Sequence, residues 1–278
     1  MQPDKTVWIT GASSGIGRQL ALDYLAAGTT VIASARSEAK LSTLAAEADL
    51  QSGAASVLDT TSQALSNDSD NTAATPAAAP RLLIAPIDVT DNAAVMALVE
   101  SLAAAEMLPD IAILNAGYYE PVELSELTLE HFETTVDVNF RGVYRCMLAL
   151  LPHYRSSSHG HIVIMSSVAG YSGLPRAAAY GATKAALTHM AESLKAEFTT
   201  AGLDLTVVNP GFVETPLTNK NRFQMPFIVS PQQASNKIIR GIEKKKFEVF
   251  FPWQFALILK FLRLLPYPLY LFIQKRLL

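Results

Sequence analysis

With 278 residues, the chain is long enough for one large α/β domain with a substantial core and too short for two such domains. Its formal net charge of -3, without a basic stripe interleaved with aromatic residues, argues against nucleic acid as a partner. A single cysteine, Cys146, excludes an intramolecular disulfide and is typical of a reducing compartment. It lies in an apolar helical run, so we expect an inert thiol in the core.

The N-terminal sequence MQPDKTVWITGASSGIG enters an expected strand at once. It lacks the basic region, apolar core and small-residue cleavage site of a secretory signal peptide. We therefore expect a cytoplasmic protein.

Short apolar runs of strand length alternate with longer segments of helical spacing. This alternation predicts βαβ units and a parallel sheet that is buried on both faces. We therefore predict a single-domain α/β protein with a doubly wound, Rossmann-type sheet of about seven strands. The expected strands are residues 6–10, 30–35, 82–89, 111–117, 161–167, 205–211 and 247–251, and the clearest helices are 17–28, 94–106 and 185–198.

The first expected strand runs directly into the glycine-rich sequence TGASSGIG, residues 10–17, and then into a helix. In such a turn Gly11 permits the tight bend, Gly15 lets the backbone approach a pyrophosphate, and Gly17 lets helix and strand pack closely. The helix N-terminus offers free N–H groups and its dipole to the anion. The sequence therefore predicts a dinucleotide site, which also includes the turn residues Ser13, Ser14 and Ile16.

The end of the second expected strand carries a clue to the cofactor. Ala35 stands where a carboxylate would hold a free ribose 2′-hydroxyl, and Arg36 follows it. A guanidinium binds a 2′-phosphate through two hydrogen bonds, whereas a carboxylate would repel it. We therefore expect NADP(H) to be preferred over NAD(H), with a solvated loop charge as the alternative interpretation of Arg36.

Residues 50–80 interrupt the alternation, because they are dominated by Ala, Ser and Thr. A helix-to-strand connection normally takes about 2 to 6 residues. Such a composition buries too little surface to offset its ordering entropy, so we interpret much of this low-complexity insertion as a mobile excursion. A tolerated insertion is favoured over a partner-binding loop. The catalytic domain is expected to span residues 1–249.

The sequence YGATK, residues 180–184, puts Tyr180 and Lys184 on one face of an expected helix. A nearby ammonium favours phenolate, so we expect Lys184 to lower the pKa of Tyr180 toward the range of an acid–base catalyst. Ser167 ends the fifth expected strand, at the sheet edge where ligands bind. Its neighbour Ser166 is the competing candidate.

Taken together, these motifs closely resemble the classical short-chain dehydrogenase/reductase family over roughly residues 5–250. The family's serine-to-tyrosine spacing selects Ser167, and the resemblance implies a catalytic tetrad that includes Asn139. In this tetrad Tyr180 gives or takes the proton, and Ser167 holds the carbonyl or alcohol oxygen. Lys184 binds the nicotinamide ribose and tunes Tyr180, and Asn139 keeps a water in the proton relay.

The same resemblance implies further cofactor contacts and an assembly state. Members of the family are commonly dimers or tetramers, so we expect a homo-oligomer. The implied contacts are Asp88 and Val89 beside the adenine, Asn115, Ala116 and Gly117 after the fourth strand, Pro210 and Gly211 at a turn, and Val213 and Thr215 at the nicotinamide carboxamide.

No metal site is expected. His159 and His161 flank Gly160 without a third ligand nearby in the sequence. Classical members of the family also need no metal.

Residues 216–229 occupy the position of the family's mobile, substrate-covering segment. Phe223, Met225, Pro226 and Phe227 are candidates to wall an apolar pocket, although such residues can equally pack on the core. We therefore expect a hydrophobic small-molecule substrate, and NADPH-dependent reduction of its carbonyl group. Two alternatives stay open: the same chemistry run toward oxidation of a secondary alcohol, and an NADP(H)-binding regulatory or scaffold protein.

Residues 250–278 are almost uninterruptedly apolar, with basic residues at both ends. A membrane-spanning helix needs about 20 apolar residues, and Lys260, Arg263 and two prolines interrupt this stretch, so a span is disfavoured. The spacing of Ala256, Lys260, Arg263 and Tyr267 predicts a helix that is wet along this one stripe and buried elsewhere.

Such a helix suits either a membrane surface or a subunit contact. The flanking basic residues favour an anionic membrane. We therefore expect a peripheral protein on the inner face of a membrane, acting on a lipid-like substrate.

Overall fold

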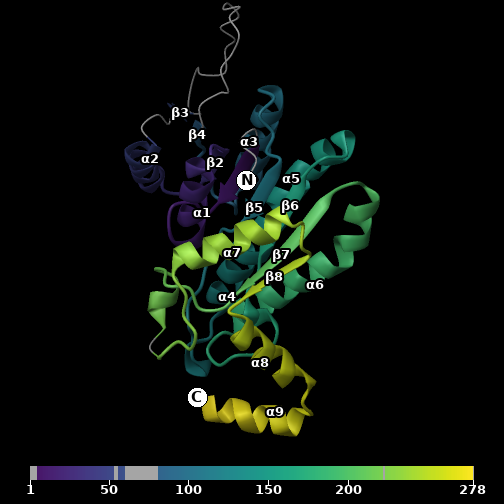
Figure 1. Ribbon diagram of the computed structural model, residues 1–278. Helices are drawn as coiled ribbons and strands as arrows, with labels where there is room; N and C mark the ends of the chain where they lie inside the picture. Colours follow the sequence, from purple (N-terminus) through teal and green to yellow (C-terminus); the bar gives the residue numbers. More distant parts are fainter. Residues whose placement is uncertain (1–4, 53–55, 60–80, 222, 278) are drawn as a thin grey trace, which may run out of the picture.

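The computed structural model describes residues 5–52, 56–59, 81–221 and 223–277. This part of the chain forms one parallel sheet with helices on both faces (Figure 1). The strands are β1 (Thr6–Thr10), β2 (Thr30–Ser34), β3 (Ser56–Asp59), β4 (Arg81–Ile84), β5 (Ile111–Leu114), β6 (His161–Met165), β7 (Asp204–Pro210) and β8 (Glu248–Phe251). The helices of more than one turn are α1 (Gly15–Ala26), α2 (Glu38–Ser52), α3 (Asn92–Ala104), α4 (Leu129–Val136), α5 (Gly142–Ser157), α6 (Ala178–Thr200), α7 (Pro231–Glu243), α8 (Trp253–Leu264) and α9 (Tyr267–Gln274).

The strand order is β3-β4-β2-β1-β5-β6-β7-β8. From β1 the chain adds strands β2, β4 and β3 on one side, and from β5 onward it adds strands on the other side, so the order reverses between β1 and β5. This order confirms the predicted α/β class and the doubly wound, Rossmann-type sheet in a single domain. In such sheets, ligands bind beyond the carboxyl ends of the strands at the point of reversal. A ligand site is therefore expected just beyond Thr10 and Leu114.

The predicted strands are all present, and the described sheet has one more, β3. Ser56 of β3 pairs in parallel with Arg81 of β4, and Asp59 pairs with Ile84. This strand lies within residues 50–80, much of which the composition predicts to be a mobile excursion. These four residues are an ordered part of that segment, because the edge of β4 offers them backbone partners. Residues 53–55 and 60–80 of the insertion lie outside the described residues.

Helices cover both faces of the sheet, which explains why the strands are apolar throughout. In β1 the side chains of Val7 and Ile9 pack into the core shared with α1, α2 and α7, whereas Trp8 packs into the core shared with α3, α5 and α6. Trp8 is completely buried, and its indole Nε1 donates a hydrogen bond to Ser34 Oγ at 2.9 Å. The polar atom of this large side chain is therefore satisfied inside the core.

Local sequence signals define the helix starts. Asp91 caps α3 by accepting a hydrogen bond from the Ala94 N–H at 3.1 Å. At α7, Ser230 Oγ accepts from the Gln233 N–H, and the Gln233 side chain accepts in return from the Ser230 N–H. Pro231 occupies the first helical position, where its missing N–H costs nothing.

After β8 the tail forms two helices, α8 and α9, at the bottom of Figure 1. Strand β8 runs across the expected boundary between residues 249 and 250, so the helices begin only at Trp253. Neither helix, nor any other in the described part of the chain, is long and apolar enough to cross a membrane.

The orientation of α8 corrects a sequence prediction. The stripe that contains Ala256, Lys260 and Arg263 is expected to face water, yet Ala256 is completely buried. Lys260 Nζ donates to Glu248 Oε2 at 2.6 Å, and Arg263 Nη1 reaches the Tyr171 carbonyl oxygen at 3.5 Å. At Ala256 and Lys260 the stripe therefore faces the body of the protein, whereas Arg263 and Tyr267 are exposed, as expected. A helical wheel cannot reveal this, because the carboxylate partner comes from β8.

The core under α5 provides a test of the fold. Leu150 is completely buried on this helix, whereas Leu148 is 47% exposed. We expect Leu150→Ala to lower the free energy of unfolding by about 2–5 kcal/mol, because it leaves a cavity. The matched Leu148→Ala should cost less than about 0.5 kcal/mol. Urea denaturation followed by circular dichroism measures both, and equal stabilities would contradict this description of the core.

Candidate active site

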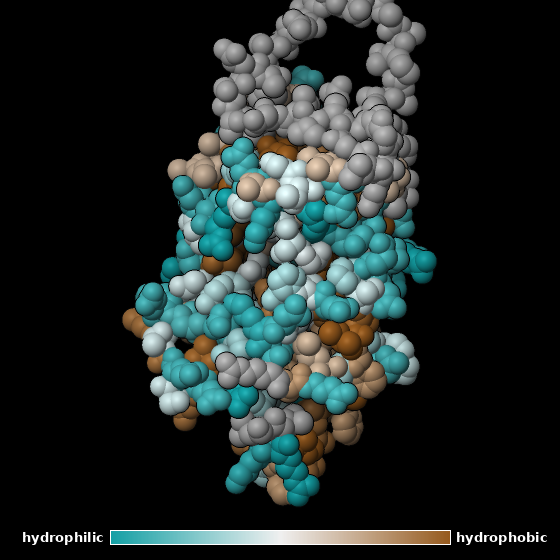
Figure 2. Space-filling model, turned by 90° about the vertical axis from the view of Figure 1, so that its left-hand side faces the viewer, coloured by the Kyte–Doolittle hydropathy of each residue, from teal (hydrophilic) through white to brown (hydrophobic). Residues whose placement is uncertain are grey.

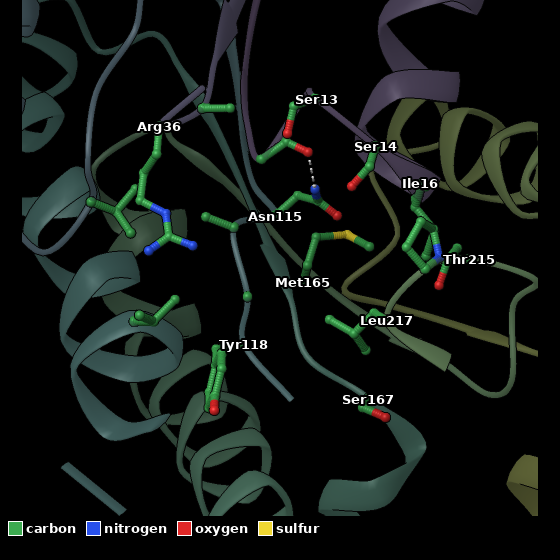
Figure 3. Close-up of a pocket in the computed structure, with 18 of the residues that line it drawn as sticks. Ser13, Ser14, Ile16, Arg36, Asn115, Tyr118, Met165, Ser167, Thr215 and Leu217 are labelled. Carbon is green, nitrogen blue, oxygen red and sulfur yellow. Dashed lines mark hydrogen bonds between the residues drawn. The ribbon is translucent and has the colours of Figure 1, made fainter. Parts of the chain in front are cut away.

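The predicted site residues gather around one cleft of about 490 Å³ at the carboxyl edge of the sheet. Figure 3 shows Arg36 and Ser14 at one end of this cleft and Ser167 at the other. Two predicted residues, Gly17 and Asn139, do not line it. Those that do are Gly11, Ser13, Ser14, Gly15, Ile16, Arg36, Asp88, Val89, Asn115, Ala116, Gly117, Ser167, Tyr180, Lys184, Pro210, Gly211, Val213 and Thr215.

The glycine-rich turn packs too closely for side chains. Gly15 has a φ of +55°, and a Cβ on it would lie 2.9 Å from Thr215 Cγ2. A Cβ on Gly17 would lie 2.4 Å from the Gly11 carbonyl oxygen, so α1 could not approach β1 with any larger residue there. The turn therefore presents bare backbone at the N-terminus of α1, which fits the pyrophosphate of a dinucleotide.

Asn115 braces this turn from β5. Its Nδ2 donates to the carbonyl oxygens of Thr10 at 3.0 Å and Gly11 at 3.3 Å, the second of which is the dashed line in Figure 3. The backbone N–H groups of Asn115 and Ala116 both donate to Thr10 Oγ1. The predicted contact residue thus also fixes the turn to the neighbouring strand.

Two exposed cations, Arg36 and Lys40, line the cleft beyond β2, with Ser37 beside them. Such a pair fits the 2′-phosphate that distinguishes NADP(H) from NAD(H). Lys40 was not predicted, although its position one helical turn after Arg36 was an available signal. Nearby, Asp88 Oδ1 accepts hydrogen bonds from the N–H and the hydroxyl of Thr90, which hold its carboxylate in place.

The two candidate serines, Ser166 and Ser167, differ in their hydrogen-bond partners. Ser166 Oγ donates to the Lys184 carbonyl oxygen at 2.8 Å and lies 3.0 Å from Thr188 Oγ1, so it joins β6 to α6. Ser167, in contrast, lines the cleft with Tyr180, and its Oγ donates to the Pro210 carbonyl oxygen at 3.3 Å and accepts from the Ala169 N–H at 3.1 Å. Ser167 is therefore the serine positioned to meet a substrate oxygen beside Tyr180.

Burial determines the pKa values of Tyr180 and Lys184. The Lys184 Nζ lies 5.5 Å from the centre of the Tyr180 ring and donates to the Met165 carbonyl oxygen at 2.8 Å. Burial raises the pKa of Tyr180 to about 12, although the hydrogen bond from Ser167 opposes the rise. Burial also lowers the pKa of Lys184 to about 8. The expectation of a lowered phenol pKa is therefore wrong for this structure, because desolvation by burial is the largest cause of the shift.

Asn139 lies in a π-helical segment, Asp137–Arg141, a local irregularity that is frequent at functional sites. Its side chain is completely buried and fully engaged. Oδ1 accepts from the Tyr118 N–H at 2.6 Å, and Nδ2 donates to the Tyr118 carbonyl oxygen at 2.8 Å and to Thr183 Oγ1 at 3.3 Å. The side chain therefore positions the loop after β5 against α6, and the water relay stays a prediction.

Tyr119 contacts Tyr180 but was not predicted from the sequence. Its ring meets that of Tyr180 edge to face, with centroids 4.9 Å apart. The Tyr119 hydroxyl donates to Asn221 Oδ1 at 2.8 Å, and Lys220 Nζ donates to the Tyr119 carbonyl oxygen and to Glu120. These contacts fasten residues 218–221 over the site. The available signal was the position of Tyr119 immediately after the Asn-Ala-Gly stretch.

The segment that follows Thr215 contributes differently from the prediction. Phe223, Met225, Pro226 and Phe227 do not line the cleft, which is lined from this segment by Pro216, Leu217 and Thr218. Phe223 packs on Phe212, and Phe227 packs on Phe255 of α8. The aromatic residues therefore connect the segment to the tail, an arrangement that the chain's local pattern does not encode.

The two histidines and the cysteine singled out in the sequence have packing or hydrogen-bonding partners within the fold. Among the described residues, no group of three or more His, Cys, Asp or Glu side chains could hold a metal ion. His159 Nε2 lies 2.9 Å from Asp110 Oδ1. His161 lies against Thr206 Oγ1, and its burial lowers its pKa to about 4. Cys146 is buried, as expected, and burial raises its pKa to about 12.

Two solved structures share this fold. A short-chain dehydrogenase from Sphingobium yanoikuyae in complex with NADPH aligns with a TM-score of 0.74 and 24% identity, over 90% of this chain and 89% of that one. An alcohol dehydrogenase from Comamonas testosteroni, specific for bulky-bulky ketones, aligns with a TM-score of 0.72 and 19% identity, over 99% of this chain and 93% of that one.

Sequence comparisons identify the family. An uncharacterised oxidoreductase from Myxococcus xanthus is 32% identical over 266 residues, which cover 96% of this chain and 94% of the relative. The profile of the short chain dehydrogenase family matches residues 5–73 and 50–226, two matches that overlap within the insertion. With this match over most of its length, the chain belongs to the short-chain dehydrogenase family and is an NAD(P)-dependent oxidoreductase.

Proposed function

We propose that this enzyme is an NADPH-dependent carbonyl reductase in which Tyr180 is the proton donor. One observation carries the proposal: Ser167, Tyr180 and Lys184 line the same cleft as the glycine turn, with the Lys184 Nζ 5.5 Å from the centre of the Tyr180 ring. Burial, the largest cause, raises the pKa of Tyr180 to about 12. At neutral pH this phenol holds its proton, which is the state that a reduction requires. Oxidation of an alcohol would use the phenolate of the same residue, so the site serves both directions and the ratio of the cofactors decides the net direction.

Each residue of the site has its own role in the proposed reaction. Bound NADPH supplies the hydride, and its site consists of the glycine turn, Arg36 and the backbone around Gly211. Ser167 donates to the substrate carbonyl oxygen and keeps it beside Tyr180. Tyr180 then gives its proton to the developing alkoxide, and the ammonium of Lys184 holds the ribose and supports the negative charge left on the phenol.

A hydrophobic, lipid-like substrate is supported by the apolar residues at the catalytic end of the cleft. Met165, Val213, Leu217, Tyr118 and Val138 all line the cleft, and Figure 3 shows Leu217 and Tyr118 toward the end that Ser167 occupies. Apolar pockets with a few convergent polar groups are typical of small-molecule sites. The bulky-ketone specificity of the Comamonas relative makes bulky ketones the first substrates to test.

The cellular setting is part of the same proposal. We place the enzyme as a homo-oligomer in the cytoplasm, peripherally bound to the inner face of a membrane. Exposed apolar side chains on α4 and α5 support the oligomer, and those of the tail support the membrane. On the first two helices they are Leu129, Phe132, Tyr144 and Leu148.

The first test removes the proton donor. Tyr180→Phe should lower kcat for ketone reduction by about 10²–10⁴-fold, because it removes general acid catalysis. NADPH binding, followed by the fluorescence of the bound cofactor, should change little. The control is Tyr24→Phe, which removes a buried hydroxyl of α1 outside the cleft and should leave kcat within about threefold. Full activity in Tyr180→Phe would refute the mechanism, and tight NADPH binding without turnover of any ketone by the wild type would favour a regulatory protein.

A second test uses pH. Below its pKa of about 8 Lys184 is an ammonium, and above it Lys184 is neutral. The kcat/KM for reduction should therefore be level at lower pH and should fall above about pH 8, by up to about tenfold per pH unit, since this quantity reports groups of the free enzyme. A profile that stays level until Tyr180 itself ionises would contradict the role assigned to Lys184.

The third test concerns the cofactor. A hydrogen-bonded guanidinium–phosphate contact contributes about 1.5–3 kcal/mol, so Arg36→Ala should raise the KM for NADPH by about 10- to 100-fold. The KM for NADH, which has no 2′-phosphate, should change by less than about threefold. Arg155→Ala, which removes an exposed arginine from α5, is the control and should affect neither cofactor. Equal losses with both cofactors would show that Arg36 does not read the 2′-phosphate.

A further inference from the structure

The two tail helices present their apolar side to the outside of the protein. On α8 the buried residues Ala256 and Leu259 face the body, together with Lys260. The opposite side carries large apolar side chains that are each 47–80% exposed. They are Trp253, Leu257, Ile258, Phe261, Leu264, Tyr267, Leu269, Leu271 and Phe272, and they form the outer tail face. Apolar colour gathers at the bottom of the molecule in Figure 2, where this tail lies.

A contiguous apolar surface of this kind marks an interaction site. The charges of the tail indicate which partner fits it. Residues 249–278 contain no Asp or Glu, and the exposed Lys275 and Arg276 follow α9 at the rim of the outer tail face. The guanidinium of Arg276 lies over the Phe272 ring at 4.4 Å, so a cation sits directly beside the apolar surface.

This charge pattern opposes a second copy of the chain as the partner. In a symmetric contact the same face meets itself, so the rim cations of the two copies would approach one another without a carboxylate from either tail. An anionic bilayer supplies the missing negative charge and accepts the apolar side chains between headgroups and acyl chains. Trp and Tyr side chains on the same face are typical of that interface.

The tail also contacts both segments that build the catalytic end of the cleft. On one side, the Gly173 carbonyl oxygen accepts hydrogen bonds from the Tyr270 hydroxyl at 2.7 Å and from Gln274 Nε2 at 3.0 Å. Gly173 lies in the loop that connects Ser167 to Tyr180. Helix α9 is therefore attached to the loop that lies between these two residues.

On the other side, α8 packs against the segment that covers the site. The Phe255 ring stacks on the Phe212 ring with centroids 5.3 Å apart. The centroid of the Phe227 ring lies 6.5 Å from that of Phe255. A Cβ on Gly211, which lines the cleft, would lie 3.0 Å from Pro252 Cδ and 3.2 Å from Phe255 Cδ1. The first turn of α8 is therefore in direct contact with the wall of the cleft.

We propose that the outer tail face docks on an anionic bilayer, and that docking holds the catalytic end of the cleft against the membrane so that the carbonyl substrate enters from the lipid phase. The proposal rests on the reductase function proposed above and specifies where its substrate is dissolved. Docking energy comes from the apolar side chains and from the cationic rim together, so binding weakens with salt.

Flotation with lipid vesicles tests the docking. The full chain should float with phosphatidylcholine vesicles that contain phosphatidylglycerol, and far less with phosphatidylcholine alone. The double variant Phe261→Ser and Leu264→Ser should reduce vesicle binding by at least about tenfold, because it removes two outward apolar side chains. The control is Met96→Ser with Leu124→Ser, which removes two exposed apolar residues from α3 and from the loop before α4 and should float like the wild type.

The oligomeric state, measured by light scattering, distinguishes the alternative occupant. If the tail variant dissociates while the wild type does not float, the outer tail face is a contact between copies, and the membrane proposal is overturned. The proposal requires the opposite: the same oligomeric state in the wild type and the variant, with flotation lost only in the variant.

Activity on two ketones tests the origin of the substrate. The tail variant should reduce a short, water-soluble ketone within about twofold of the wild type. With a long-chain ketone dissolved in the anionic vesicles, its rate should fall by at least about tenfold. Equal rates on the vesicle-dissolved ketone would overturn substrate entry from the lipid. If the wild type reduces neither ketone, the proposed reductase function is refuted. The flotation result still tests membrane docking independently.

Discussion

The close contact between Gly17 and the Gly11 carbonyl oxygen is the constraint on which the whole site depends. It brings α1 against β1 without an intervening side chain, so the helix N-terminus lies at the edge of the sheet where strand order reverses. Asn115 then ties the same turn to β5, across the point of reversal. Every other residue of the cleft takes its position relative to this junction, because the parallel sheet brings all its carboxyl ends to one edge.

Within this frame, burial governs the chemistry more than charge does. Tyr180 and Lys184 are both enclosed, so the phenol keeps its proton and the amine holds its proton less tightly. Both shifts bring the pair closer to what a reduction needs: a neutral acid beside a cation that titrates near the working pH. The engagement of the Asn139 side chain with Tyr118 and Thr183 keeps this buried arrangement rigid.

Much of the site could be predicted from the sequence, because its signals are local. The glycine turn needs only a strand, a bend and a helix start, and Tyr180 and Lys184 need only one helical turn between them. Tyr119 and the orientation of α8 could not be predicted in the same way. Their partners, Asn221 and Glu248 among them, come from distant parts of the chain, and only the folded arrangement brings them together. The pKa of Tyr180 was mispredicted for a related reason, since burial is a property of the whole fold.

In the tail, the ion pair between Lys260 and Glu248 lies on the side of α8 that faces the body of the protein. Glu248 accepts hydrogen bonds from Tyr171, Asn209 and Lys260, so the cation of α8 is used on the inner side of the helix. The apolar side is then left outward, which is unfavourable in water for a protein that has no partner there. Because the same helix packs through Phe255 on the wall of the cleft, whatever covers its outer side also lies next to the substrate. For an enzyme of hydrophobic carbonyl compounds, a lipid surface meets both requirements with one contact.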